Sequence, residues 1–251
     1  MHVWTTAAEW MSRRQDLSGS IGFVPTMGAL HCGHAALIER CRAENEIVVA
    51  SIFVNPAQFN DPKDLERYPR TLESDLSLLE SLGTGEVLAP PASEIYPLGS
   101  RFCIEEEPLT RPMEGVCRPG FFQGVMLVVL KLLNLVRAGR AYFGEKDYQQ
   151  LQVVRDLARE FFVGTEIVAC PTVREASGLA ASSRNALLSP AAREKAAALF
   201  RVLNTAPATD VARDLLADEG FTVDYVEEHW GRRFAAARLE GVRLIDNVPL
   251  P

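Results

Sequence analysis

Two histidines three residues apart, His31 and His34, are the side chains whose types and spacing most directly indicate chemistry in this 251-residue chain. They follow an apolar run at 21–24, which predicts a buried strand, and directly precede a helical pattern. Gly28 and Gly33 leave the backbone open to a ligand, and the start of a helix offers unpaired N–H groups. The pattern predicts an anion site, most simply for a phosphate. Zinc is the alternative, but no Cys/His cluster elsewhere supplies the remaining ligands.

Two further segments carry side chains that suit phosphate. Lys146 follows Gly144 at an apparent strand end, and its ammonium is a point charge that can reach phosphate oxygens. Ser182, Ser183 and Arg184 place two hydroxyl donors and a guanidinium in a row. Taken singly, a lysine is usually an exposed surface residue, and such serines form an ordinary turn between domains. The prediction therefore rests on the three segments together.

The composition limits the partners of the chain. The formal net charge is −7 and the pI is near 5.3, which argues against general binding to nucleic acid or to an anionic membrane. The five cysteines form no C-x-x-C pair and suit a reducing cytosol. Residues 1–10 have no signal-peptide pattern, and the longest apolar segment, 124–136, is too short to span a bilayer. We therefore expect a cytoplasmic protein that binds neither nucleic acid nor membrane.

Short apolar runs alternate with helical patterns along most of the chain. The run at 46–54 predicts a strand buried on both faces, as in a parallel sheet, and a further strand is expected at 101–104. The alternation predicts a doubly wound, Rossmann-like parallel α/β sheet for residues 1–174. Beyond it, helices come first and short strands follow, which predicts a small α+β domain at 175–251.

In a doubly wound sheet, ligands lie outside the carboxyl ends of the strands. His31 and His34 follow one apparent strand end, Asn55 and Gln58 follow the next, and Lys146 follows a third. The topology alone therefore predicts that these side chains gather at one edge of the sheet.

Five segments, in order, resemble the pantothenate synthetase (pantoate–β-alanine ligase) family of the His-x-Gly-His nucleotidylyl-transferase superfamily, which also includes class I aminoacyl-tRNA synthetases. The matching segments are Val24-Pro25-Thr26-Met27-Gly28-Ala29-Leu30-His31, Ser51-Ile52-Phe53-Val54-Asn55-Pro56-Ala57-Gln58-Phe59, Arg67-Tyr68-Pro69-Arg70-Thr71, Tyr142-Phe143-Gly144-Glu145-Lys146-Asp147 and Ser182-Ser183-Arg184-Asn185. The resemblance covers about residues 21–190 and is visible again as Arg243-Leu244-Ile245-Asp246-Asn247.

The resemblance implies an ATP-dependent ligase of pantothenate biosynthesis, on the route to coenzyme A. The carboxylate of pantoate attacks the α-phosphorus of ATP, which releases pyrophosphate and leaves pantoyl adenylate. The amine of β-alanine then attacks the acyl carbon, AMP leaves and pantothenate forms. No enzyme nucleophile is needed, so the protein positions the substrates and stabilises phosphate charge. The family also implies Mg²⁺ at the phosphates, a homodimer formed through the N-terminal domain, and a C-terminal domain that acts as a lid.

The same resemblance assigns roles to single residues. The catalytic residues that it implies are His31, His34, Lys146, Ser182, Ser183 and Arg184. ATP binding adds Met27, Gly28, Gly144 and Asp147 to these. Pantoate binding is implied for Gln58, Gln150, Asn55, Met27 and Arg118, since an amide offers a carboxylic acid with a hydroxyl group both a donor and an acceptor. Asp75 is the expected Mg²⁺ ligand.

Several positions depart from the family pattern. Cys32 stands where many members carry Glu, Ser74 replaces an acidic residue beside Asp75, and Phe121 occupies a position that is commonly His. Ala181 precedes the serines where Met is usual, and the C-terminal domain is expected to be shortened. Since the other polar groups implied in the chemistry are intact, we expect an active enzyme.

Three alternatives differ from this function. A nucleotidylyl transferase that keeps a dinucleotide product would need a second basic cluster, where this chain has Gln58 and Gln150. A tRNA synthetase fragment would need an anticodon-binding region and a basic surface, whereas this chain is short and acidic. A non-catalytic ATP-binding sensor gives no reason for Lys146, His34 and Arg184 to occur together.

Overall fold

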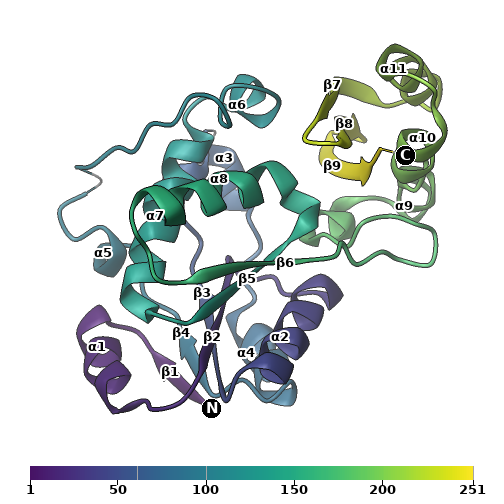
Figure 1. Ribbon diagram of the computed structural model, residues 1–251. Coiled ribbons are helices and arrows are strands. Elements are labelled where there is room, and N and C mark those ends of the chain that lie inside the picture. Colours follow the sequence, from purple (N-terminus) through teal and green to yellow (C-terminus); the bar gives the residue numbers. More distant parts are fainter. Residues whose placement is uncertain (61, 100, 251) are drawn as a thin grey trace. The chain divides into compact units, whose positions relative to one another are not determined.

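The computed structural model describes residues 1–60, 62–99 and 101–250, and the chain forms two compact units. The first unit comprises Met1–Gly144 and Gln149–Cys170, and the second comprises Glu145–Tyr148 and Pro171–Pro251 (Figure 1). The second unit thus includes, besides the C-terminal part of the chain, a short segment that follows Gly144.

Within the described residues, the first unit contains one sheet of six parallel strands in the order β1-β4-β3-β2-β5-β6. The direction in which successive strands are added reverses between β2 and β5, so the sheet is doubly wound and this is its switch point. The predicted doubly wound parallel sheet is confirmed. The strands are β1 His2–Trp4, β2 Ile21–Thr26, β3 Ile47–Ile52, β4 Glu86–Leu88, β5 Arg140–Gly144 and β6 Glu166–Cys170.

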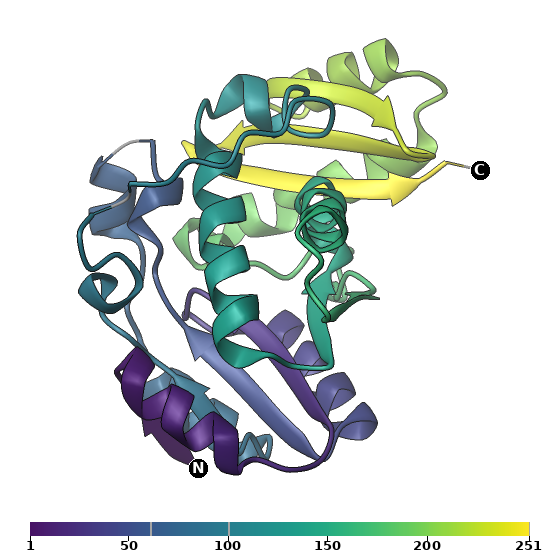
Figure 2. The ribbon, with the colours of Figure 1, turned by 60° about the vertical axis from the view of Figure 1, so that its left-hand side comes forward.

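Helices cover both faces of this sheet (Figures 1 and 2). Helices α2 (Cys32–Glu44) and α4 (Leu72–Ser81) lie on one face, whereas α1 (Ala7–Asp16), α7 (Phe121–Val136) and α8 (Tyr148–Glu160) lie on the other. This is the arrangement that right-handed crossovers require. The connections hold shorter helical segments: η1 Pro56–Gln58, α3 Pro62–Arg67, α5 Ala92–Ile95, α6 Glu114–Cys117 and η2 Glu145–Asp147.

The core of the first unit is apolar on both sides of the sheet. Toward α2 and α4, Val24 and Ala50 pack with Ile38 and Leu79, and each of these four side chains is at most 1% exposed. On the other face, the fully buried Trp10 of α1 donates its indole N–H to the Leu135 carbonyl of α7 at 2.8 Å. The central strands are buried on both faces, which is why they appear in the sequence as nearly continuous apolar runs.

Two short segments differ from the sequence prediction. Strand β2 continues through Pro25 to Thr26, although the sequence predicts its end at Val24. Proline lacks the N–H of a ladder bond, but β5 pairs with β2 only at Gly22 and Phe23, so that bond is not needed here. The prediction of a strand at 101–104 is wrong, because this part of the described chain is irregular and pairs with no strand.

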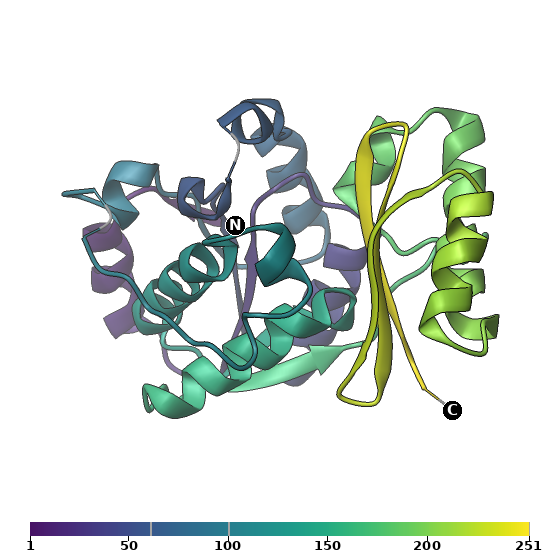
Figure 3. The same ribbon diagram turned by 90° about the horizontal axis from the view of Figure 1, so that it is seen from above.

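The second unit is a small α+β domain, as predicted. Its antiparallel sheet has the order β7-β8-β9, and its helices lie against one face of that sheet (Figure 3). Leu199 and Leu203 of these helices pack on Ala235, Ala237 and Leu244 of the sheet. In the described parts of both units, no helix is long and apolar enough to cross a membrane. The elements are η3 Ser183–Leu187, α9 Pro190–Ala196, α10 Ala198–Thr205, α11 Thr209–Asp218, β7 Thr222–His229, β8 Arg232–Leu239 and β9 Val242–Pro249.

Candidate active site

Residues 27–31, which we call the histidine turn, connect β2 to α2 next to the switch point of the sheet. Thr26 ends β2, and its hydroxyl donates to the Ser51 carbonyl on β3 at 2.6 Å and accepts from the Gly28 N–H at 3.2 Å. Gly28 and Ala29 both have positive φ, 79° and 50°. Glycine adopts this conformation freely, whereas alanine rarely does. The turn therefore has an unusual, well-defined shape just before α2 begins at Cys32.

His31 and His34 together cap the start of α2. His31 is the N-cap residue, and its Nδ1 accepts from the Gly33 N–H at 3.1 Å. His34 Nδ1 accepts from the His31 N–H at 3.3 Å, which completes a reciprocal capping box. The ring centroids are 4.1 Å apart. Because each Nδ1 accepts, a neutral ring carries its proton on Nε2, so both imidazoles offer an Nε2–H donor that suits a phosphate oxygen.

Asp75 of α4 contacts this turn. Its carboxylate is only 3% exposed and accepts from the N–H groups of Ala29 at 2.9 Å and Leu30 at 2.8 Å, and from the Thr71 hydroxyl at 3.1 Å. Mg²⁺ demands oxygen lone pairs in near-ideal octahedral geometry, and three donors of the chain already face this carboxylate. These contacts do not suit the predicted role of metal ligand. Among the described residues, no group of three His, Cys, Asp or Glu could hold a metal ion.

Four of the five residues predicted for the pantoate site are joined by contacts around Gln58, which follows β3: Met27, Asn55, Gln58 and Arg118. Asn55 is 1% exposed and uses its whole amide inside the protein: Nδ2 donates to Gln58 Oε1 and the Gly124 carbonyl, both at 3.0 Å, while Oδ1 accepts from the Tyr96 hydroxyl at 2.8 Å and the Ala57 N–H at 3.2 Å. Asn55 therefore holds Gln58 in place and has no hydrogen-bonding capacity left for a substrate.

Gln58 makes a weaker contact on its other amide atom. Its Nε2 donates to the sulfur of Met27 at 3.0 Å, and a thioether is a weak acceptor. A carboxylate or hydroxyl oxygen would take this donor in preference. Arg118 lies beside Gln58, because its guanidinium donates to the Gln58 carbonyl at 3.3 Å and stacks 3.6 Å from the ring centroid of Phe121.

The two adjacent glutamines of α8 have different surroundings. Gln149 is buried: its amide donates to the carbonyls of Leu109 at 2.8 Å and Pro112 at 2.9 Å and accepts from the Glu114 N–H at 3.2 Å. It fixes the loop that leads to Arg118. Gln150, the residue predicted to bind pantoate, is partly exposed. Sequence reasoning missed Gln149, since a Gln-Gln pair does not indicate which amide is buried.

In the second unit, a buried asparagine holds the segment that contains Lys146. Asn247 of β9 is 1% exposed, and its Nδ2 donates to the carbonyls of Glu145 and Lys146, each at 2.9 Å. Lys146 Nζ lies 3.7 Å from a carboxylate oxygen of Asp147. The sequence assigned no role to Asn247, although it ends the last segment that resembles the family.

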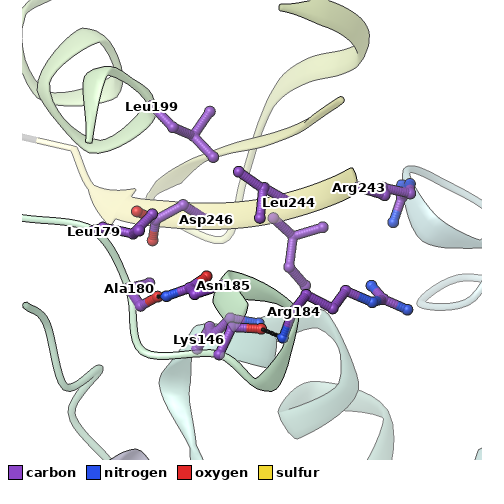
Figure 4. Close-up of a pocket in the computed structure, with 11 residues that line it drawn as sticks. Lys146, Leu179, Ala180, Arg184, Asn185, Leu199, Arg243, Leu244 and Asp246 are labelled. Atoms are coloured by element: carbon purple, nitrogen blue, oxygen red, sulfur yellow. Dashed lines mark hydrogen bonds between the residues drawn. The ribbon is translucent and has the colours of Figure 1, made fainter. Parts of the chain in front are cut away.

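Lys146 lines a small cavity of about 20 Å³ in the second unit together with part of the segment from Ser182 to Arg184, which we call the serine loop (Figure 4). Ser182 is the N-cap of η3, its Oγ accepts from the Arg184 N–H at 3.3 Å, and Ser183 is the first residue of η3. Among the described residues that line the cavity, Asp246 is the only acid, and the Arg174 guanidinium neutralises it by donating to both carboxylate oxygens, at 2.7 and 2.9 Å. The cavity therefore favours negative charge. Its polar lining includes Lys146, Ser182, Arg184, Asn185, Arg243 and Asp246.

Asn185 and Glu175 fix the serine loop. Asn185 is 4% exposed and donates to Glu175 Oε1 at 2.9 Å and to the Ala180 carbonyl at 3.0 Å. Arg193 donates to both carboxylate oxygens of Glu175, at 3.1 and 2.9 Å. The hydrogen bonds from Arg193, followed by that from Asn185, hold the pKa of Glu175 below its usual value. Glu175 is therefore charged at neutral pH and keeps the loop in this conformation.

The fold and these residues define a class: a Rossmann-like, doubly wound α/β protein with a His-x-Gly-His turn at its switch point. A family model described as pantoate-beta-alanine ligase matches residues 2–249. The pantothenate synthetase of Bdellovibrio bacteriovorus is 48% identical over 248 residues, which are 99% of each chain. That of Legionella pneumophila is 46% identical over 252 residues and covers 100% of both.

Solved structures give the same result. The pantothenate synthetase of Thermus thermophilus superposes with a TM-score of 0.92 at 45% identity over 100% of both chains. A pantoate-beta-alanine ligase of Francisella tularensis, complexed with beta-gamma ATP and beta-alanine, has a TM-score of 0.95 at 39% identity and covers 99% of this chain and 97% of that one. The chain belongs to the pantoate–β-alanine ligase family and is a ligase, which confirms the resemblance drawn from the sequence.

The capping box predicts the tautomers of both site histidines. In long-range ¹H–¹⁵N spectra of protein labelled with ¹⁵N-histidine, we expect His31 and His34 to show the Nε2–H pattern at a pH where the rings are neutral, because each Nδ1 accepts a backbone N–H. His2 and His229 serve as internal references outside the box. An Nδ1–H pattern for either site histidine would contradict this geometry.

Proposed function

We propose that this chain condenses pantoate with β-alanine at the expense of ATP, through pantoyl adenylate. A pantoate carboxylate oxygen bonds to the α-phosphorus while the bond from that phosphorus to the bridging oxygen breaks and pyrophosphate leaves. The amine of β-alanine then displaces AMP from the acyl carbon, which gives pantothenate. Membership of the family supports this reaction, and the complex of the Francisella tularensis ligase with beta-gamma ATP and beta-alanine fits it. The observation that carries the proposal is the pair of imidazoles that cap α2 through Nδ1.

The adenylation step requires donors for the charge that moves onto pyrophosphate. The Nε2–H groups of His31 and His34 suit this role, and the N-terminal dipole of α2 acts in the same direction. Lys146 supplies a positive charge for the α-phosphate. The serine loop, Ser182 to Arg184, supplies hydroxyl and guanidinium donors for the β- and γ-phosphates.

The rest of the predicted ATP site involves close approach of the backbone. Gly28 lies in the turn after β2, and Gly144 is the last residue of β5, where an added Cβ would meet no described atom within 4 Å. Met27 and Asp147 complete the proposed set. Mg²⁺, when bound with ATP, supplies further charge neutralisation at the phosphates.

Pantoate binding is assigned to Gln58 and Gln150, with Arg118 beside them. Gln58 Nε2 exchanges its weak contact with the Met27 sulfur for an oxygen of pantoate. Asn55 orients Gln58 and does not itself contact the ligand, since its own amide is fully used. The amide of each glutamine suits a carboxylic acid with hydroxyl groups, because its NH₂ group can donate to the carboxylate and its carbonyl oxygen can accept from a hydroxyl.

The compartment and the assembly complete the proposal. We assign the chain to the cytoplasm, and its five free thiols support a reducing compartment. We assign it a homodimer formed through the N-terminal domain. Exposed apolar side chains of the first unit, Leu98 at 70% and Phe102 at 77%, are consistent with such an interface. The second unit is proposed to act as a lid during turnover.

The decisive experiment follows both half-reactions. Pantoate alone should support exchange of labelled pyrophosphate into ATP, and AMP should accumulate only when pantoate and β-alanine are both present. A dinucleotide product would identify a different nucleotidylyl transferase. ATP binding without pantoate-dependent exchange would identify a sensor.

Lys146→Ala should reduce the adenylation rate by roughly 10²–10³-fold, the usual loss when one charge partner of a transition state is removed. The rate of pyrophosphate exchange under saturating pantoate measures this effect. Lys195→Ala, which removes an exposed lysine of α9, is the matched control and should leave the rate unchanged. A Lys146→Ala rate within a few-fold of the parent would remove Lys146 from the mechanism.

Gln58→Ala should mainly raise the KM for pantoate, by about tenfold, since the loss of one hydrogen bond to a charged group costs about 1.5 kcal/mol. The KM for ATP should stay close to that of the parent. Steady-state kinetics with each substrate varied in turn separate the two constants. Gln123→Ala, which alters an exposed glutamine of α7, should change neither constant. An unchanged KM for pantoate in Gln58→Ala would contradict the assignment.

A further inference from the structure

One carboxylate in α4 binds two consecutive N–H groups of the histidine turn. Asp75 Oδ1 accepts from Leu30 N at 2.8 Å, and Oδ2 accepts from Ala29 N at 2.9 Å. Successive N–H groups that converge on one anion form a nest, which needs left-handed backbone in the turn. Gly28 and Ala29, at φ 79° and 50°, provide that backbone. The shape of the turn and the position of the carboxylate therefore depend on each other.

Thr71 fixes the carboxylate from the other side. It is the N-cap residue of α4, but its hydroxyl makes no cap bond and instead donates to Asp75 Oδ2 at 3.1 Å. The Asp75 N–H donates to the Thr71 carbonyl at 2.9 Å. The carboxylate also has little free space, since a Cβ on Gly28 would lie 2.9 Å from Oδ2. Asp75 therefore cannot shift unless the turn shifts with it.

The turn leads directly into the histidine pair. Leu30, whose N–H is bound by Asp75, precedes His31, and the His31 N–H is bound by His34 Nδ1 at 3.3 Å. The direction of each Nε2–H group therefore follows from the path of the backbone at residues 29–30. We infer that Asp75 is a positioning residue for His31 and His34 that acts through this backbone, and that it does not serve as a metal ligand.

The consequence for turnover rests on the proposed function. If His31 and His34 stabilise the departing pyrophosphate, their displacement by about 1 Å costs up to about 10²-fold in rate. Asp75→Asn should lower the rate of pantoate-dependent pyrophosphate exchange by about 10- to 100-fold. The Mg²⁺ concentration that gives half of the maximal rate should remain that of the parent, because no ligand of the metal has been removed.

The direct test uses the spectra of ¹⁵N-histidine in a buffer with a chelator and without any divalent cation. Asp75→Asn keeps the shape of the side chain but turns one acceptor toward the nest into an NH₂ donor. We expect the resonances of His31 and His34 to shift, while those of His2 and His229 stay in place and report that the fold is intact. Glu73→Gln, which neutralises an exposed acid of the same helix, should leave all four histidines unchanged.

Thr71→Val is the milder second variant. It removes one of the three hydrogen bonds to the carboxylate and no helix cap, so it should shift the same two histidines by less and in the same direction. It decides the question if Asp75→Asn does not fold.

Unchanged histidine spectra in both variants would overturn the inference, as would a raised Mg²⁺ requirement as the only effect of Asp75→Asn. The histidine spectra need no substrate. A parent protein without pyrophosphate exchange would therefore contradict the proposed function and leave the spectral test of Asp75 intact.

Discussion

The site depends on one buried negative charge, the carboxylate of Asp75. The left-handed backbone of Ala29 costs about 1–2 kcal/mol, and no glycine relieves it there. Hydrogen bonds to a charged group contribute about 1.5–3 kcal/mol each, and Asp75 accepts three of them. These hydrogen bonds therefore offset the cost of burying the carboxylate and stabilise the unusual backbone of the turn. The capping box of His31 and His34 begins at the residue after this turn, so the chemistry of the imidazoles depends on an acid that never touches the substrate.

Buried amides perform the same task elsewhere in the molecule. Asn55 orients Gln58, Gln149 fixes the loop before Arg118, and Asn247 holds the backbone of Lys146. An amide suits this task because it donates and accepts at once and stays uncharged when buried. The predicted substrate contacts are thus partly exposed or weakly bound, while an adjacent buried group with every hydrogen bond satisfied sets their direction. A division of this kind keeps the ligand-facing atoms available without leaving buried polar groups unpaired.

The sequence predicts the central sheet well because β3 and its neighbours are buried on both faces, so their apolar runs are continuous. It does not predict β1, since His2–Trp4 is short and largely exposed at the edge of the sheet. It predicts His31, His34 and Lys146 as phosphate-binding residues from local motifs, and the family resemblance adds Gln58. The roles of Asp75, Gln149 and Asn247 escape it, because each depends on partners about 35 to 100 residues away, which spacing along the chain does not indicate.

Three of the departures from the family pattern spare this hydrogen-bonded framework. Cys32 is exposed at the start of α2, and Ser74 is exposed on α4, where its hydroxyl bonds the Thr71 carbonyl and leaves the Asp75 carboxylate untouched. Phe121 replaces a titratable ring with one that stacks on the Arg118 guanidinium at 3.6 Å. Stacking of this kind needs no proton on the ring. The orientation of Arg118 beside Gln58 is therefore independent of any titration at this position, and the substitution preserves the pantoate side of the proposed site.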